Sequence, residues 1–156
     1  MEVSDVKLSD SCIRNVSFGD NVSIVKPVNL YGCDIGSDTK IGPFVEIQND
    51  VVIGSHCKIQ SHSFICSLVT IGNNVFIGHG VVFVNDTFST GAPAGGNMRL
   101  WKKTCVGDNV SIGSNATILP VSICADVIIG AGAVVTKNIY QPGFYAGNPA
   151  RIMRAR

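Results

Sequence analysis

Apolar residues recur at every sixth position along most of this chain. The series runs from Ile35 to Phe83, continues backwards to Phe18, and resumes between Val106 and Val135. The residue after the apolar one is often glycine, which suits a turn that needs positive φ. The residue four places after it is mostly small or β-branched. The series has eighteen members, all apolar: Phe18, Ile24, Leu30, Ile35, Ile41, Ile47, Ile53, Ile59, Ile65, Ile71, Ile77, Phe83, Val106, Ile112, Ile118, Ile123, Ile129 and Val135.

This spacing predicts short strands rather than helices. An amphipathic helix would repeat its apolar residues every three or four positions, whereas β-branched residues between turn residues are typical of strands. Three hexads close one triangular coil, so the sequence predicts an all-β parallel β-helix of about six coils, spaced about 4.8 Å apart. Two steps have five residues, Leu30 to Ile35 and Ile118 to Ile123, and we expect both to shorten the same corner.

The repeat is interrupted from about residue 86 to residue 103 and resumes immediately afterwards. We interpret this segment, which contains TGAPAGGN, as a functional loop extruded from one corner; a tolerated insertion is the alternative. The whole chain, 1–156, is expected to form one β-helix domain with a C-terminal tail over 138–156.

Composition and charge narrow the function classes. Only 15% of residues are charged and the net charge is +1, which argues against disorder and against a broad nucleic-acid surface. No run of about 18 apolar residues exists and the N-terminus has no apolar leader, so we expect no membrane span or secretion signal. Six cysteines without a CxxC pair favour free thiols and a reducing, cytoplasmic compartment. After Asp126 the chain has basic residues but no acidic one, which leaves room for a small anionic ligand.

Several motifs strongly resemble those of hexapeptide-repeat acyltransferases: IGPFVEIQNDVVIG, CKIQSHSFIC, VFIGHGVVFVND, IGSNATILP, IGAGAVVTK and AGNPAR. Within that family the chain looks most like the N-acetyltransferases that modify a 3-amino sugar linked to a nucleotide. The resemblance covers roughly residues 16–154. It implies a left-handed coil, although right-handed crossovers are the rule. It also implies acetyl-CoA as cosubstrate and a homotrimer with active sites between adjacent prisms.

Amide formation from a thioester needs an unprotonated amine, a proton acceptor and donors for the developing oxyanion. His79 in IGHGV is the first candidate for the general base, with a surface histidine in a structural hydrogen bond as the alternative. Asn85 in FVND could orient the amine or donate to the oxyanion, or it could simply cap the loop backbone. Asp86 could bind the ammonium form or orient His79, although an aspartate is common at the start of a loop.

Polar side chains in the most regular part of the repeat are candidates for substrate binding. The register stacks Tyr31 and Gln48 with Cys66 and Val84 on one face, which also carries Asn85. We expect this face to contact the sugar and nucleotide, while a ladder of amides that stabilises the coils is the alternative. The candidates are Tyr31, Glu46, Gln48, Gln60 and His62. His56, at an exposed turn, is interpreted as structural.

For coenzyme A, the resemblance indicates residues in four motifs near the C-terminus. The basic ones also fit physically, because a 3′-phosphorylated adenosine diphosphate carries several negative charges. The predicted contacts are Ser114, Ala131, Thr136, Lys137, Arg151 and Arg154.

The sequence therefore suggests transfer of an acetyl group from acetyl-CoA to the 3-amine of a dTDP- or UDP-linked amino deoxysugar, for surface polysaccharides such as lipopolysaccharide. A sugar or serine O-acetyltransferase is the main alternative, but members of the family that acetylate sugar hydroxyls carry a histidine in the external loop, and residues 86–103 contain none. A non-catalytic scaffold is the third possibility. A zinc site is not expected, since His56 and His62 fall on different faces and His79 on another coil.

Overall fold

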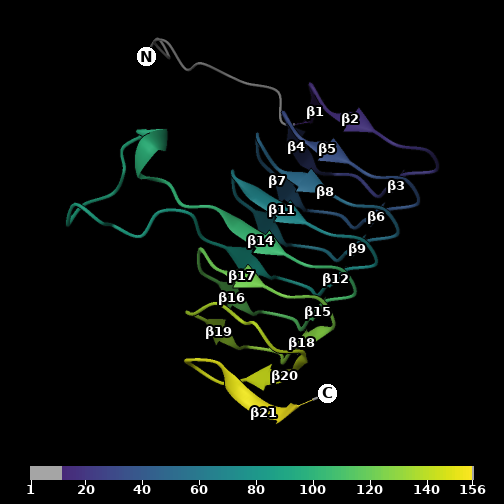
Figure 1. The fold of residues 1–156 in the computed structure, drawn as a ribbon. Helices are drawn as coiled ribbons and strands as arrows, with labels where there is room; N and C mark the ends of the chain where they lie inside the picture. The colour runs from purple at the N-terminus through teal and green to yellow at the C-terminus, as the bar shows by residue number, and fades with distance from the viewer. Residues whose placement is uncertain (1–11, 156) are drawn as a thin grey trace, which may run out of the picture.

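The computed structural model describes residues 12–155, which form a three-sided prism of stacked coils (Figure 1). Parallel strands from successive coils make up each side, and only the last strand, β21, runs antiparallel to its neighbour. The fold is a left-handed parallel β-helix, as the repeat and the resemblance predict. It has about seven turns instead of six, because the first coil begins at Ile13, five residues before the first member of the series.

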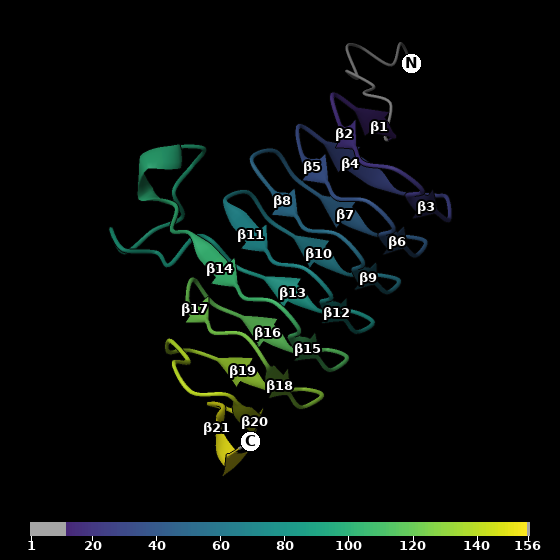
Figure 2. The same cartoon turned by 45° about the vertical axis from the view of Figure 1, so that its right-hand side comes forward.

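The strands are short, and from β1 to β19 they alternate among the three sheets in sequence order (Figure 2). Sheet A contains β1 (Ile13–Arg14), β4 (Asn29–Tyr31), β7 (Glu46–Ile47), β10 (Phe64–Ile65), β13 (Val82–Phe83), β16 (Thr117–Ile118) and β19 (Val134–Val135). Sheet B contains β2 (Ser17–Phe18), β5 (Asp34–Ile35), β8 (Val52–Ile53), β11 (Val69–Ile71), β14 (Thr104–Val106) and β17 (Ser122–Ile123). Sheet C contains β3 (Ser23–Ile24), β6 (Lys40–Ile41), β9 (Lys58–Ile59), β12 (Phe76–Ile77), β15 (Ser111–Ile112), β18 (Val127–Ile129), β20 (Gly143–Ala146) and β21 (Arg151–Ala155).

The apolar series forms the core of the prism. In sheet A, Leu30 pairs with Ile47 and Ile47 with Ile65, so equivalent side chains stack one coil apart. Every member of the series is buried except Phe18, which is 42% exposed, and the half-buried Ile24; both belong to the first coil. Each buried isoleucine contributes about 1.5–3 kcal/mol of hydrophobic stabilisation. The coils therefore depend on their neighbours for most of their stability.

The shortened corner is also confirmed. Leu30 and Ile118 lie in sheet A, and the residues five positions later, Ile35 and Ile123, lie in sheet B. The step from Ile13 to Phe18 has the same length and turns the same corner. The five-residue steps thus all turn the corner between sheets A and B, although the same corner takes six residues from Ile47 to Ile53 and from Ile65 to Ile71.

The interpretation of the repeated glycines was wrong in its physical reason. Positive φ occurs three places after the apolar residue, for example at Asp38, with φ of 59°, and not at the glycine one place after it. The glycines are required because adjacent coils approach closely. A Cβ on Gly36 would lie 2.5 Å from the carbonyl carbon of Gly54, which no real contact allows. Coil stacking therefore selects glycine at this position.

The interruption forms a long loop between β13 and β14 that projects from the side of the prism, as both views show. It contains one turn of 3-10 helix, η1 (Met98–Leu100), which is the only helical element in residues 12–155. The amide of Lys102 donates to the carbonyl of Asn85 at 2.9 Å, which closes the neck of the loop. Among the described residues no helix has the length and apolarity to cross a membrane.

The C-terminal segment continues the prism. Strand β20 pairs with β18, and β21 folds back against β20 as the edge of sheet C. The segment predicted as a tail thus closes the last coil with a hairpin.

Candidate functional site

Five of the predicted site residues lie along the corner where the chain passes from sheet C to sheet A, here called the C–A corner. Consecutive coils place Ser61, His79, Ser114 and Ala131 one above another on this corner. The amide of Asn115 donates to the carbonyl of His79, and the amide of Gly132 donates to the carbonyl of Ser114, both at 2.8 Å. His79 and two predicted coenzyme A contacts therefore form one continuous row.

The His79 imidazole is exposed and is held by one ring nitrogen. Its Nδ1 lies 2.8 Å from Oγ of Ser61 in the coil above. A hydroxyl can accept a hydrogen bond from Nδ1–H, and that tautomer leaves Nε2 as a proton acceptor. Among residues 12–155 no group bonds to Nε2, so this nitrogen is available to a ligand.

Gln60 and His62 lie on the same corner, one coil above His79. The His62 ring stacks on the ring of Phe44, with centroids 4.8 Å apart and an interplanar angle of 27°. The next residue in this column is Gly80, which has no side chain to fill the space under His62. The C–A corner therefore carries an exposed aromatic pair above His79.

Asn85 and Asp86 lie at the opposite end of β13, at the A–B corner where the long loop begins. The Asn85 carboxamide donates from Nδ2 to the carbonyl of Ser67 at 3.2 Å. Asp86 accepts hydrogen bonds from two loop amides, Phe88 at 2.9 Å through Oδ1 and Ala94 at 2.7 Å through Oδ2. Both oxygens of Asp86 thus fix the loop, and His79 is oriented by a serine instead.

The polar residues on the face of sheet A bond to one another. Gln48 donates from Nε2 to Oε1 of Glu46 at 3.1 Å and accepts from the amide of Ser67 at 3.3 Å. Burial raises the pKa of Tyr31, and the negative charge of Glu46 raises it further. Arg14 lies over the Tyr31 ring, 5.2 Å from its centroid. These contacts order the row of Tyr31 and Gln48 that the register predicts.

A pocket of about 430 Å³ lies between the face of sheet A and the long loop. Gln48, Asn85 and Asp86 provide its polar side chains. Phe64, Phe88 and Trp101 provide aromatic surface. Cys66 also lines the pocket, but burial raises the pKa of its thiol to about 12, so it stays protonated at neutral pH. It is therefore a poor nucleophile.

Three predicted coenzyme A contacts converge on a second pocket near the C-terminus. Thr136, Lys137 and Arg151 line this space of about 290 Å³, together with Tyr145 and Ile152. Arg154 does not join them, because it lies in a separate small pocket beside Phe144 on sheet C. Two cations thus meet where the resemblance implies a phosphorylated ligand.

The catalytic candidates and the coenzyme A candidates are each divided between the C–A corner and the A–B corner. His79 and Asn85 are separated by β13 and are up to about 20 Å apart along an extended chain. The coenzyme A candidates divide likewise, with Ser114 and Ala131 on the C–A corner and Thr136 on the A–B corner. Within one prism the members of each set therefore lie on two different corners.

Several residues of these surfaces were not singled out from the sequence. Ser61 lies one coil above His79, and Phe44 lies two coils above it. Only an alignment of equivalent positions in successive coils could have identified them from the sequence. No sequence motif marks Phe64, Phe88 or Trp101 as a pocket residue. The conformation of the loop places Phe88 and Trp101 opposite Phe64 on sheet A.

Two models of hexapeptide families match the chain: bacterial transferase hexapeptide (six repeats) over residues 32–67, and hexapeptide repeat of succinyl-transferase over residues 103–137. The bifunctional protein GlmU of Thermodesulfovibrio yellowstonii is 31% identical over 159 residues, which cover 86% of this chain and 33% of that protein. GlmU of Acetivibrio thermocellus is 33% identical, with coverage of 89% and 27%. The chain thus spans about a third of the length of these relatives.

Solved structures share the fold over most of the chain. A variant of AntD, an N-acyltransferase from Bacillus cereus in complex with dTDP and coenzyme A, superimposes with a TM-score of 0.79 at 26% identity, covering 90% of this chain and 83% of that one. A hexapeptide-repeat acetyltransferase from Vibrio cholerae, complexed with acetyl coenzyme A, gives 0.68 at 24% identity, with coverage of 80% and 70%. Together with the repeat through the whole prism, these matches show that the chain has the hexapeptide-repeat fold and carries the hexapeptide repeats of bacterial transferases over residues 32–67 and 103–137.

Proposed function

We propose that this protein is an acetyl-CoA-dependent N-acetyltransferase whose acceptor is the 3-amino group of a dTDP- or UDP-linked amino deoxysugar. The product would serve surface polysaccharide synthesis, with the reaction in the cytoplasm. AntD, which shares the fold and 26% of its sequence, is an N-acyltransferase with dTDP and coenzyme A in its structure. This likeness supports both the nucleotide and the thioester donor.

The division of the candidates between two corners is the observation that carries the proposal. If the C–A corner of one prism faced the A–B corner of another at the same height, His79 would meet Asn85, and Ala131 would meet Thr136 and Lys137. One arrangement would therefore complete the catalytic pair and the coenzyme A contacts together. A closed homotrimer repeats such a contact three times, so each protomer supplies both corners.

In this site the acceptor amine attacks the carbonyl carbon of the thioester. The new C–N bond forms as the C–S bond breaks, and coenzyme A leaves as a thiolate. The proton lost by nitrogen goes to Nε2 of His79, or directly to the thiolate, which ends as the thiol. Because Asn85 uses Nδ2 to bond Ser67, its Oδ1 remains to accept from the amine, so holding the acceptor fits this side chain better than an oxyanion contact.

The donor would occupy the row below His79. The pantetheine arm would follow Ser114 and Ala131, and the phosphates would lie near Lys137 and Arg151. Charge-assisted hydrogen bonds from these two side chains suit phosphate oxygens.

The test is thiol release from acetyl-CoA with a panel of acceptors: dTDP- and UDP-linked 3-amino sugars, a 4-amino sugar, a plain hexose and serine. The proposal predicts turnover on a nucleotide-linked 3-amino sugar. Turnover only on the hexose or on serine would identify an O-acetyltransferase instead. A protein that binds no coenzyme A would be a scaffold.

A further inference from the structure

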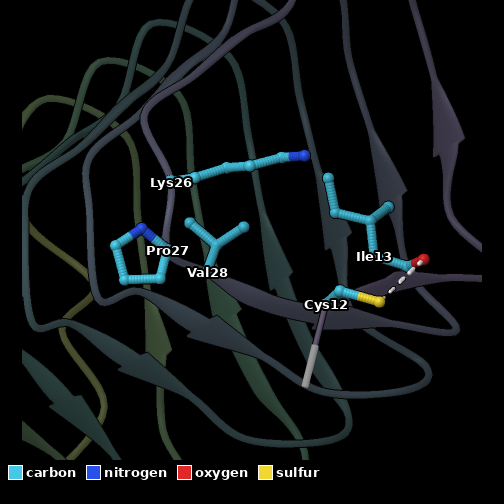
Figure 3. A pocket seen from close by; sticks show the side chains of 5 residues that line it. All are labelled: Cys12, Ile13, Lys26, Pro27 and Val28. Carbon is cyan, nitrogen blue, oxygen red and sulfur yellow. Dashed lines mark hydrogen bonds between the residues drawn. The ribbon is translucent and has the colours of Figure 1, made fainter. Parts of the chain in front are cut away.

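A pocket of about 250 Å³ lies at the N-terminal end of the C–A corner, and the proposed reaction leaves it without a role. Its lining is Pro27, Val28, Asn29, Phe44, Val45 and Glu46. Pro27 and Val28 also border a neighbouring pocket with Cys12 and Ile13, and Figure 3 shows the Lys26 side chain lying across that second space. The first pocket continues the row of Ser61 and His79 towards the N-terminus.

Phe44 gives this pocket an exposed aromatic surface. Its φ is 61°, a left-handed conformation that most corner positions of this chain give to asparagine, aspartate or glycine. A bulky residue pays a steric cost of roughly 1–2 kcal/mol there. The ring is 57% exposed, so burial recovers little of this cost, although one face stacks on His62. Strain of this kind points to a ligand-binding role.

Two polar side chains beside Phe44 form a defined hydrogen-bonding edge. Asn29 and Glu46 are paired across β4 and β7. Arg14 donates to Oδ1 of Asn29 at 3.4 Å, and because a guanidinium only donates, this contact assigns the amide oxygen and leaves Nδ2 as a donor. Gln48 donates to Oε1 of Glu46, and Oε2 has no hydrogen-bond partner among residues 12–155. A free donor therefore lies next to a free acceptor.

The distance to His79 matches one class of ligand. Phe44 is two coils above His79 and Asn29 is three, which places the pocket about 10–14 Å away along the prism. In a nucleoside diphosphate sugar, thirteen bonds separate a 3-amine from the base, and their extended length is at most roughly 16 Å. A base in the pocket would thus leave the amine at His79.

We propose that this pocket binds the nucleobase of the acceptor and selects a pyrimidine dione, uracil or thymine. This inference rests on the proposed function. The base lies against Phe44, its N3–H donates to Glu46, and a neighbouring carbonyl oxygen accepts from Nδ2 of Asn29. Cytosine presents an amino donor and an unprotonated N3 at the same edge. Its amino group would face the Nδ2 donor of Asn29, and its N3 acceptor would face the carboxylate of Glu46.

Calorimetric titration of the intact protein with UDP, dTDP, CDP and ADP, without an acyl donor, tests the pocket. UDP and dTDP should bind at least tenfold more tightly than CDP and ADP. Phe44→Ala should weaken UDP at least tenfold. Glu46→Gln preserves shape but replaces the acceptor, so it should reduce the preference for UDP over CDP. Phe76 is an exposed aromatic residue on sheet C, away from the pocket. Phe76→Ala is therefore the matched control and should bind UDP as the parent protein does.

Equal binding of the four nucleotides, or no binding of any, would overturn the inference. So would unchanged UDP affinity in both Phe44→Ala and Glu46→Gln, with circular dichroism confirming that each variant is folded. The readout does not depend on turnover. If UDP binds in the expected pattern while no amino sugar is acetylated, the pocket stands and the proposed reaction fails.

Discussion

Ser61 holds His79 by a hydrogen bond between two coils, with Oγ 2.8 Å from Nδ1. The bond fixes the plane of the ring and, when the serine accepts, makes Nε2 the basic nitrogen. A residue eighteen positions away in sequence thus favours one tautomer of the candidate base. Stacked coils provide such contacts throughout this fold.

Replacing Ser61 by alanine should lower kcat/KM without unfolding the prism. Loss of one hydrogen bond of about 1 kcal/mol corresponds to roughly a fivefold effect, and the loss of the correct tautomer adds to it. Ser55→Ala is the matched control, because Ser55 lies on another corner of the same coil. Steady-state kinetics with equal losses in both variants would exclude an orienting role for Ser61.

Asp86 should act through the loop. Asp86→Asn replaces one acceptor oxygen by a donor, so the amide of the buried Ala94 or that of Phe88 loses its partner. We expect faster proteolysis between residues 88 and 100 and a lower kcat/KM, with a melting temperature close to that of the parent. Asp34→Asn, on the outer face of β5, is the control. An unchanged rate of loop cleavage would show that Asp86 does not hold the loop.

Gly36→Ala should destabilise the prism, since its Cβ would lie 2.5–2.7 Å from backbone atoms of the next coil. Overpacking of this kind costs about 1–3 kcal/mol. Gly130 occupies the same place in the hexad on the C–A corner of a later coil. There a Cβ would lie 3.0 Å from the Cβ of Ala146 and 3.3–3.5 Å from the Phe144 ring, so a shift of a few tenths of an ångström relieves the contacts. Thermal unfolding should therefore show a larger loss for Gly36→Ala than for Gly130→Ala. The reverse order would contradict close coil stacking as the reason for these glycines.

The thiol of Cys66 should be nearly inert in the folded protein. With its pKa raised to about 12 by burial, on the order of one thiol in ten thousand is ionised at pH 8. Iodoacetamide at pH 8, followed by mass spectrometry, should label the exposed Cys105 first and Cys66 only after denaturation. Equal labelling rates in the native protein would show that the pocket is open to solvent at Cys66.

Lys137→Ala should raise the KM for acetyl-CoA while leaving kcat nearly unchanged. Loss of about 1 kcal/mol corresponds to roughly a fivefold increase in KM, and screening should shrink the effect at high salt. Lys40→Ala, an exposed lysine on sheet C, is the control. An effect that does not depend on salt would argue against a phosphate contact.

Regular features of this fold were predictable from the sequence because they repeat. The isoleucine ladder and the shortened corner after Leu30 and Ile118 follow from position in the hexad alone. The contacts of the candidate site do not repeat. Which side chain meets His79 depends on which coil lies above it, and the role of Asp86 depends on the path of the loop. The glycine at position 36 was predictable, but its reason was not, because coil-to-coil distances are a property of the folded chain.

Mixing two inactive variants tests the shared site most directly. His79→Ala and Asn85→Ala should each abolish acetyl-CoA-dependent thiol release on the 3-amino sugar substrate. When the two chains are co-expressed in equal amounts, random assembly should return about a quarter of the parent activity, because a quarter of the contacts pair an intact His79 with an intact Asn85. No recovery in mixed oligomers, or full activity in either single variant, would contradict an active site built from the corners of two protomers.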